Sequence, residues 1–199
     1  MLRDLIVGPH QISFDITNKC NLRCLHCYNS SGENLASQNE LTDQEVLDFI
    51  DEFKSIKLLN FCFCGGEPLL RKELIVEAAK RLRTYGCENV AMVSNGILMT
   101  DEVIEELINA GVTRIQISLD GIKAESHDRI RNKKGVYEKA TRAIEALVKH
   151  GVDTAVAFTP TSFNISELRA VRDYLHTVGI SGTCLLYTSP SPRDGATSR

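Results

Sequence analysis

The 199 residues suit one domain, and 43% hydrophobic with 25% charged residues is ordinary for a globular chain. A net charge of −3 without a long basic run argues against binding to nucleic acid or to an anionic membrane surface. Residues 1–7 are too short and too charged for a signal peptide, and no apolar run could span a bilayer, so we expect no membrane association. Seven cysteines then favour metal or redox chemistry over disulfides, and we expect a reducing, cytoplasmic compartment.

Strand-like and helix-like segments alternate along the chain. Apolar alternation or short apolar runs predict strands at 11–17, 58–64, 89–95, 114–120 and 152–159. Apolar stripes at helical spacing predict helices at 42–57, 74–82, 101–110, 137–150 and 166–178. Strict alternation of this kind is typical of a parallel sheet with right-handed crossovers. We therefore expect an α/β fold, a partial (β/α)6 TIM-like barrel of parallel strands that is truncated near strand six.

The last stretch departs from this alternation. Residues 184–194, CLLYTSPSPRD, carry two of the five prolines and show neither helical nor strand periodicity. They resemble the translation of a transposon-end adapter used in preparing sequencing libraries; the alternative is a natural Ser/Pro-rich linker. We expect an incomplete core domain at 1–183 and a non-native tail at 184–199. Because a sixth strand is due near Ile180, the fifth strand should lack most of its partner.

Three cysteines stand in a short loop directly after the first predicted strand. Cys20, Cys24 and Cys27 have C-x3-C-x2-C spacing in the run CNLRCLHCY. A cubane iron–sulfur cluster needs four iron ligands, usually thiolates, so this run would leave one iron for a small molecule. The alternative is half of a zinc site at Cys24 and Cys27, with His26 or Cys20 as a further ligand. No second C-x2-C or H-x3-H follows, and the cluster is therefore favoured.

Further motifs follow the next predicted strands, at the rim where parallel barrels gather their sites. They are Gly65-Gly66-Glu67 ahead of Pro68, then Ser94-Asn95-Gly96, and then Ser118-Leu119-Asp120. By period two, Ser118 and Asp120 should point into the barrel, where polar groups need a partner. Arg131 could bind a carboxylate through two parallel hydrogen bonds, although a lone arginine is more often a solvated surface residue.

Together these motifs resemble the radical S-adenosylmethionine (radical SAM) superfamily over roughly residues 11–180. The resemblance implies that Cys20, Cys24 and Cys27 hold a [4Fe–4S] cluster whose fourth iron binds SAM. It implies a flavodoxin-like or ferredoxin-like external one-electron reductant, reductive cleavage of SAM to a 5′-deoxyadenosyl radical, and hydrogen abstraction from the substrate. It also implies contacts with SAM. Gly65, Gly66 and Glu67 would meet the amino group, Ser94 and Asn95 the ribose or methionyl part, and Ser118 and Asp120 the ribose hydroxyls and carboxylate. Arg131, with Arg129 as the substitute, would meet the carboxylate, and His26 would lie beside the adenine.

The substrate is less clearly indicated than the chemistry. The motif sequences look most like superfamily members with a C-terminal extension that carries auxiliary clusters, the SPASM type. We therefore predict peptide or protein maturation, with tetrapyrrole or small-cofactor biosynthesis as the alternative substrate class. The alternative outside the enzymes is a non-catalytic zinc or iron–sulfur binding module.

A pair of cysteines and one histidine lie near these motifs in the sequence but are not part of them. Cys62 and Cys64 share one face of the second predicted strand, and we interpret both as buried, inert thiols. His127 either supports the site from behind or lies at the rim, and the sequence leaves both possibilities open.

Overall fold

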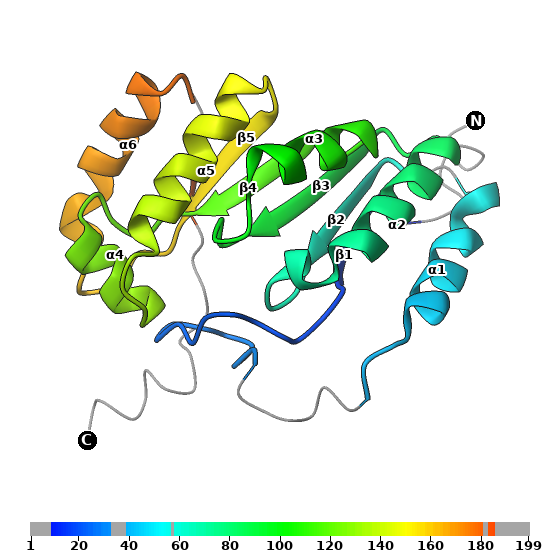
Figure 1. The fold of residues 1–199 in the computed structure, drawn as a ribbon, viewed down its shortest axis with the longest axis horizontal. Coiled ribbons are helices and arrows are strands. Elements are labelled where there is room, and N and C mark those ends of the chain that lie inside the picture. The colour runs from blue at the N-terminus through cyan, green and yellow to red at the C-terminus, as the bar shows by residue number, and fades with distance from the viewer. Residues whose placement is uncertain (1–8, 33–38, 57, 181–182, 186–199) are drawn as a thin grey trace.

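A single parallel sheet organises the computed structural model, which describes residues 9–32, 39–56, 58–180 and the backbone of 183–185 (Figure 1). Each strand pairs with the next one along the chain, in the order β1-β2-β3-β4-β5-β6, so the described strands form an open sheet. The strands are β1 Gln11–Asp15, β2 Asn60–Cys64, β3 Asn89–Ser94, β4 Arg114–Ser118, β5 Asp153–Phe158 and β6 Thr183–Leu185. The predicted α/β fold, a partial barrel of parallel strands, is confirmed.

Helices lie between successive strands and cover the outer face of the sheet (Figure 1). They are α1 Asp43–Asp51, α2 Lys72–Thr84, α3 Asp101–Asn109, α4 Ala124–Arg131, α5 Tyr137–Lys149 and α6 Leu168–Thr177, with short 3-10 turns η2 Glu52–Ser55, η3 Pro68–Arg71 and η4 Ile165–Glu167. Helix α1 begins at a capping box, in which Thr42 and Glu45 each accept a hydrogen bond from the other's backbone N–H. Within the described part of the chain, every helix is too short or too polar to cross a membrane.

The two faces of the sheet differ in burial. Residues that face the helices, such as Phe61, Phe63 and Ile115, are fully buried in the core. On the opposite face, Gln116 and Ser118 are only half-buried. This alternation follows the period-two pattern of the strands and leaves the polar side chains of β4 on the inner face, as predicted.

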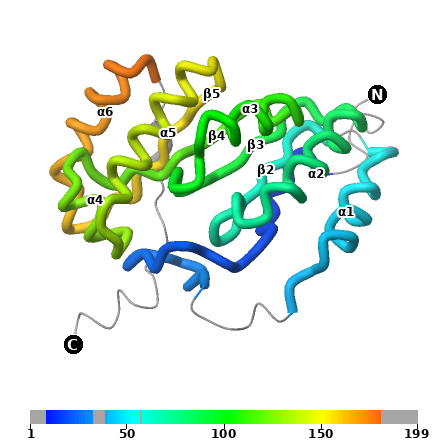
Figure 2. Tube along the Cα trace, viewed as in Figure 1, coloured from blue at the N-terminus to red at the C-terminus, as the bar shows by residue number. Residues whose placement is uncertain are grey.

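The chain after β1 runs across the carboxyl ends of the strands and reaches α4 (Figure 2). Leu25 N donates to the carbonyl oxygen of Ile130 at 2.8 Å, which attaches this loop to α4. Asn95 Nδ2, after β3, donates to Asn21 Oδ1 at 2.7 Å. The segment that carries the three cysteines is therefore held against the sheet from two directions.

The structure differs from the expected elements in two places. Helix α4 was not predicted, because its buried residues are His127, Ile130 and Arg131 and give no apolar stripe. The second difference lies at strand six, where the sequence predicts truncation and a tail from residue 184 without strand periodicity: a strand of three residues, β6, pairs with Val156–Phe158 of β5. Strand β6 includes Cys184 and Leu185 of the predicted tail, whereas 186–199 lie outside the described residues.

Candidate active site

A cavity of about 320 Å³ opens at the carboxyl ends of the strands. All but two of the residues predicted for the site line it, namely Cys20, Cys24, His26, Cys27, Gly65, Gly66, Ser94, Asn95, Ser118 and Arg131. The two exceptions, Glu67 and Asp120, are fully buried. A larger hollow of about 660 Å³ beside Leu25 contains none of the predicted site residues, only Arg129, the substitute for Arg131. The smaller cavity is therefore the candidate site.

Each of the three predicted ligand sulfurs accepts a hydrogen bond from a nearby N–H group. The donors are the backbone N–H of Leu22 to Cys20 Sγ at 3.4 Å, the backbone N–H of Ser31 to Cys27 Sγ at 3.4 Å, and Nη1 of Arg131 to Cys24 Sγ at 3.7 Å. Hydrogen bonds to the sulfurs are one of the means by which proteins set the reduction potential of iron–sulfur clusters.

The chemistry of this donor set fits a cluster better than a single metal ion. Burial raises the pKa of the Cys20 and Cys24 thiols, so that a bound metal would be needed to keep them deprotonated. In the ranges that the structure describes, no three His, Cys, Asp or Glu side chains are arranged to hold a single metal ion. A cubane, in contrast, takes each thiolate on a separate iron.

Gly65 and Gly66 allow the chain after β2 to approach the chain after β1. A Cβ added to Gly66 would lie 2.2 Å from the carbonyl oxygen of Lys19, and one added to Gly65 would lie 2.3 Å from that of Thr17. Gly66 N donates to Thr17 O, and Glu67 N donates to Lys19 O, both at 2.8 Å. The two glycines therefore fix the backbone that leads into Cys20. Their contact with the SAM amino group stays a prediction.

We expect Gly66→Ala to weaken retention of a cluster, because a methyl group has no room against Lys19. The overpacking should lower the free energy of unfolding by about 1–3 kcal/mol. Iron content after anaerobic reconstitution and gel filtration measures the effect on the loop. Gly86→Ala is the control, since a Cβ there meets nothing within 4 Å and only its φ of +87° is unfavourable. Equal iron retention in both variants would contradict the role assigned to Gly66.

The Glu67 side chain joins the loops that follow β2 and β3. It is fully buried and accepts hydrogen bonds from Leu69 N at 3.2 Å, Ser94 Oγ at 2.8 Å and Asn95 N at 2.9 Å. Burial raises the pKa of this carboxyl group, whereas the hydrogen bonds act in the opposite direction. Because its oxygens are engaged by the protein, Glu67 positions the cavity wall; its predicted contact with SAM is left as a prediction.

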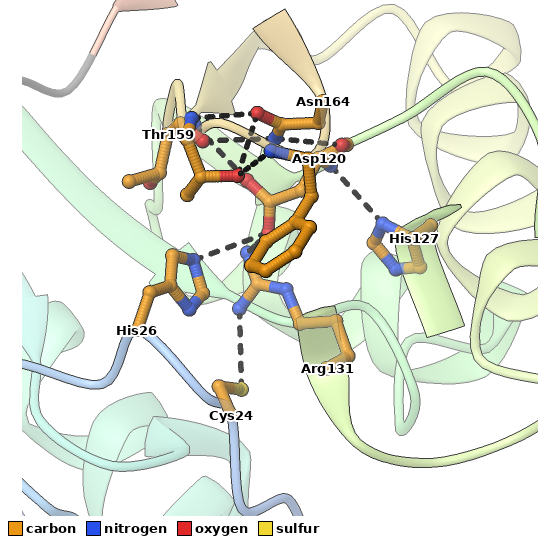
Figure 3. Close-up of polar contacts among 9 residues, drawn as sticks. Cys24, His26, Asp120, His127, Arg131, Thr159 and Asn164 are labelled. Carbon is orange, nitrogen blue, oxygen red and sulfur yellow. Dashed lines mark hydrogen bonds and ion pairs between the residues drawn. The ribbon is translucent and has the colours of Figure 1, made fainter. Parts of the chain in front are cut away.

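Asp120 lies behind the cavity wall and holds two residues of that wall, Arg131 and His26 (Figure 3). Its Oδ2 is 2.7 Å from Arg131 Nη2 and 3.3 Å from His26 Nε2. Thr159 N donates to Oδ1 at 3.0 Å. Burial by itself raises the pKa of a carboxyl group, but Arg131 and then His26 hold the pKa of Asp120 well below its usual range. Asp120 is therefore a carboxylate that connects β4, α4 and the cysteine loop.

The turn after β4 is fixed by two more buried side chains. Burial, and then the charge of Arg131, lowers the pKa of His127 to about 4, so that this imidazole is neutral at pH 7. Its Nδ1 accepts a hydrogen bond from Asp120 N at 3.0 Å. Asn164 Nδ2 donates to the carbonyl oxygens of Asp120 and Thr159, both at 2.9 Å. Of the two possibilities that the sequence left for His127, the structure supports the one in which it holds the site from behind.

Four residues that contribute to this arrangement were missed in the sequence. Asn21 and Glu40 position the cysteine loop, since Glu40 accepts from Thr17 Oγ1 at 3.0 Å and from Asn18 N at 2.7 Å. Thr159 and Asn164 position Asp120. Thr159 ends the fifth predicted strand. It could have been found, like the other motifs, from the rule that sites gather at the carboxyl ends of parallel strands. Asn21, Glu40 and Asn164 carry no such signal.

The sequence pattern of the radical SAM superfamily matches residues 14–175, which include all three cysteines and every loop of the cavity. The chain belongs to the radical SAM superfamily. Members of this superfamily use a [4Fe–4S] cluster and SAM. The family assignment and the donor set of this radical SAM chain therefore agree, and the zinc alternative is not supported.

Curated relatives of this radical SAM chain include a synthase and a maturase. It is 33% identical over 189 residues to an AdoMet-dependent heme synthase of Methanosarcina barkeri, covering 94% of this chain and 52% of that protein. It is 34% identical over 164 residues to the mycofactocin maturase MftC of Mycolicibacterium smegmatis, covering 81% of this chain and 40% of the maturase. The chain thus spans about half the length of the curated relatives it matches.

Solved structures share the fold. Streptococcus suis SuiB superposes with a TM-score of 0.78 at 11% identity, over 96% of this chain and 43% of SuiB. The enzyme anSMEcpe, with bound AdoMet and the Cp18Cys peptide, gives a TM-score of 0.73 at 20% identity, over 88% of this chain and 50% of that enzyme. At these identities the likeness establishes the fold of the radical SAM core and nothing about the substrate of this chain.

Proposed function

We propose that this chain is the cluster-binding and SAM-binding core of an enzyme that uses SAM to abstract hydrogen from its substrate. The observation that carries the proposal is the cavity in which three hydrogen-bonded thiols meet the loops that follow β2 to β5. Cys20, Cys24 and Cys27 would hold a [4Fe–4S] cluster. When bound, the cluster and SAM supply a one-electron reduction that breaks a carbon–sulfur bond of SAM and yields a hydrogen-abstracting radical.

The residues of the chain position and shield these groups. Arg131 places its guanidinium between Asp120 and Cys24, which fixes the Cys24 sulfur. A small apolar cluster made by Leu22, Cys24 and Val136 packs against Cys20 and Cys27. The radical chemistry needs a dry, fixed site because water and misplaced groups open side reactions.

Two buried side-chain nitrogens of residues that line the cavity support SAM as the ligand. Arg131 Nε and His26 Nδ1 are buried, and neither has a hydrogen-bond partner in the described part of the protein. If His26 Nε2 donates to Asp120, its Nδ1 is an acceptor, which suits the amino group of an adenine. Arg131 Nε is a donor and suits a carboxylate oxygen. The resemblance to the superfamily implies the same contacts for these two residues.

We expect Ser118→Ala to weaken SAM binding and to leave the fold intact. Ser118 is half-buried on the inner face of β4 and lines the cavity. Loss of a partner to a polar or charged ligand group should reduce affinity by about 1–3 kcal/mol. Isothermal titration of the anaerobically reconstituted chain with SAM measures it. The exposed Ser55 in η2 provides the control Ser55→Ala. If the affinities of the two variants were the same, Ser118 would not be a SAM contact.

Anaerobic reconstitution tests the proposed function directly. We expect about four irons and four sulfides per chain. With dithionite as the reductant, SAM should be converted to methionine and 5′-deoxyadenosine. Near-stoichiometric zinc without sulfide would instead support a non-catalytic metal-binding module. In the cell, we propose a flavodoxin-like or ferredoxin-like reductant and a reducing, cytoplasmic setting, in keeping with the free thiols.

For the substrate we propose peptide maturation, supported by the 34% identity to a maturase. Tetrapyrrole biosynthesis is the second candidate, because the match to a heme synthase covers 94% of this chain. A protein extended to the length of these relatives can distinguish the two. SAM cleavage should increase with a precursor peptide encoded beside the gene, and an increase with a tetrapyrrole alone would favour the second candidate.

A further inference from the structure

A second hollow lies beside the cysteine loop, outside the candidate site. It has a volume of about 660 Å³ and is lined by Leu25 and by residues of α4 and of the turn that follows α4. Cys24 and His26 line the candidate site, whereas Leu25 between them lines this hollow and is 44% exposed. Successive residues of the loop therefore border the two spaces alternately, and the hollow gives access to the loop without passing through the candidate site.

We propose that this hollow and the basic residues around it form the docking surface for an acidic one-electron carrier protein. The inference rests on the proposed function and adds the place at which its reductant binds. On docking, the carrier loses one electron and the cluster held by Cys20, Cys24 and Cys27 gains it, so no further reactant is required. The carrier stays outside the cavity, which is left to SAM and the substrate.

The surface beside the thiols is basic although the whole chain is not. Residues 18–32 and 121–136 together contain seven lysines and arginines but only two acidic residues, whereas the whole chain has a net charge of −3. One of the seven, Arg131, is buried and paired with Asp120. The others are all exposed: Lys19, Arg23, Lys123, Arg129, Lys133 and Lys134. A carrier with an acidic surface would be attracted and oriented by these charges.

The two acidic residues offset this charge only in part. Asp128 is half-buried, and its carboxylate accepts hydrogen bonds from the backbone N–H groups of Gly135, Val136 and Tyr137 at 2.6, 3.1 and 2.9 Å. Its charge is therefore directed toward the turn after α4. Glu125, in the first turn of α4, is the one exposed carboxylate in these two stretches.

The basic turn after α4 is attached directly to the cysteine loop, which reaches α4 in Figure 2. Leu25 N donates to the carbonyl oxygen of Ile130 at 2.8 Å, and Lys133 Nζ donates to that of Asn21 at 3.4 Å. A carrier bound to these residues would contact the loop in which the thiols lie. The electron then has only this loop to cross before it reaches the cluster.

Exposed apolar groups lie among the basic side chains. Leu25 and Ala124 line the hollow, and the guanidinium carbon of Arg129 lies 4.2 Å from the centre of the Phe163 ring. Phe163 is 55% exposed. Electron-transfer encounters have small interfaces, below about 1,200 Å². A few apolar contacts surrounded by charge suit such an interface, because the charges steer the encounter while the small area lets the carrier leave.

Charge reversal tests the surface through the rate of cluster reduction. The reconstituted chain is compared with Lys123→Glu/Lys134→Glu, which leaves Lys133 and its contact with the cysteine loop in place. Stopped-flow absorption follows reduction by the hydroquinone of an acidic flavodoxin. At low salt the double variant should react at least about tenfold more slowly, because charged surfaces raise association rates by about 10–10³. The difference should shrink as added salt screens the charges.

Two controls separate docking from the state of the cluster. Lys80→Glu/Lys149→Glu changes the net charge equally at exposed positions on α2 and α5 and should react like wild type. Photoreduced 5-deazariboflavin is small and uncharged, so it should reduce the cluster equally fast in all three proteins. The proposal is overturned if flavodoxin reduces wild type and Lys123→Glu/Lys134→Glu at the same rate, or if both double variants lose the same amount.

Cross-linking tests the docking surface without a cluster. A carbodiimide joins carboxylates of the flavodoxin to lysines that it contacts in the apo chain, and mass spectrometry identifies them. We expect links at Lys123, Lys133 and Lys134, and links at Lys80 or Lys149 in their place would contradict the proposal. The expected links in a chain that fails to assemble a cluster would refute the proposed function and leave the docking surface standing. Their absence in a protein extended to the length of the relatives would show that the rest of the chain covers the hollow, which would also overturn the proposal.

Discussion

Replacing Cys20, Cys24 or Cys27 singly with alanine should abolish the charge-transfer absorption of the reconstituted chain and its cleavage of SAM. Each thiolate would hold a different iron, so the loss of one leaves two irons without a protein ligand and makes the cluster labile. Each sulfur also accepts a hydrogen bond from its own N–H donor in the structure. Iron and sulfide analysis together with the visible spectrum measures the loss.

The remaining described cysteines supply matched controls for these variants. Cys62→Ala, Cys64→Ala and Cys87→Ala remove a thiol of the same size from β2 or from the loop before β3. Cys62 and Cys64 are only half-buried, so the prediction that they are buried thiols is wrong about their burial. All three should retain the cluster. If a variant of the triad kept about four irons while Cys62→Ala lost them, the ligand assignment would have to be changed.

The sequence was sufficient to predict most of the sheet, because its strands alternate cleanly between core and cavity. Ile115 and Ile117 are fully buried while Gln116 between them is not, and this is the period-two pattern that the sequence displays. Helix α4 lacked an equivalent signal. It buries His127 and Arg131, whose burial depends on partners elsewhere in the chain rather than on an apolar stripe.

The location of the site could likewise be predicted, but the contacts within it could not. The motifs could be placed together because each follows a strand, and the carboxyl ends of parallel strands lie at the same edge of the sheet. A place after a strand does not show that Glu67 faces Ser94 and Asn95, or that Asp120 lies behind the wall instead of lining it. These contacts depend on side chains far apart in sequence, such as Thr159, which is 39 residues from the carboxylate it binds. Hydrogen bonds of this kind leave no local pattern in the sequence.

We expect Asp120→Asn to lower the free energy of unfolding by about 3–5 kcal/mol, the usual cost of breaking a buried ion pair by removing one partner. Asp120 is fully buried and Arg131 is 9% exposed, so the substitution would leave a largely buried guanidinium without its ion-pair partner. Asparagine keeps the shape and can still accept from Thr159 N, which isolates the effect of the charge. Denaturant titration at pH 7 measures the difference.

The pH dependence gives a second readout of the same pair. The pKa of Asp120 is lower in the folded protein than in the unfolded chain, where it is about 4. The stabilisation is therefore complete above about pH 4 and is lost as the pH falls further toward the folded-state pKa. The difference in unfolding free energy between wild type and Asp120→Asn should accordingly stay constant from pH 7 to pH 5 and shrink at lower pH.

Two controls separate the pair from a general effect of charge. Asp173→Asn removes an exposed partner of Arg172 and should cost less than about 1 kcal/mol. Combining Asp120→Asn with Arg131→Met should recover part of the lost stability, because the unpaired buried charge is then absent. The double variant should nevertheless bind iron more weakly than wild type, since Cys24 no longer has its guanidinium donor. If Asp120→Asn cost no more than Asp173→Asn, the Asp120–Arg131 pair would not be what joins β4 and α4 to the cysteine loop.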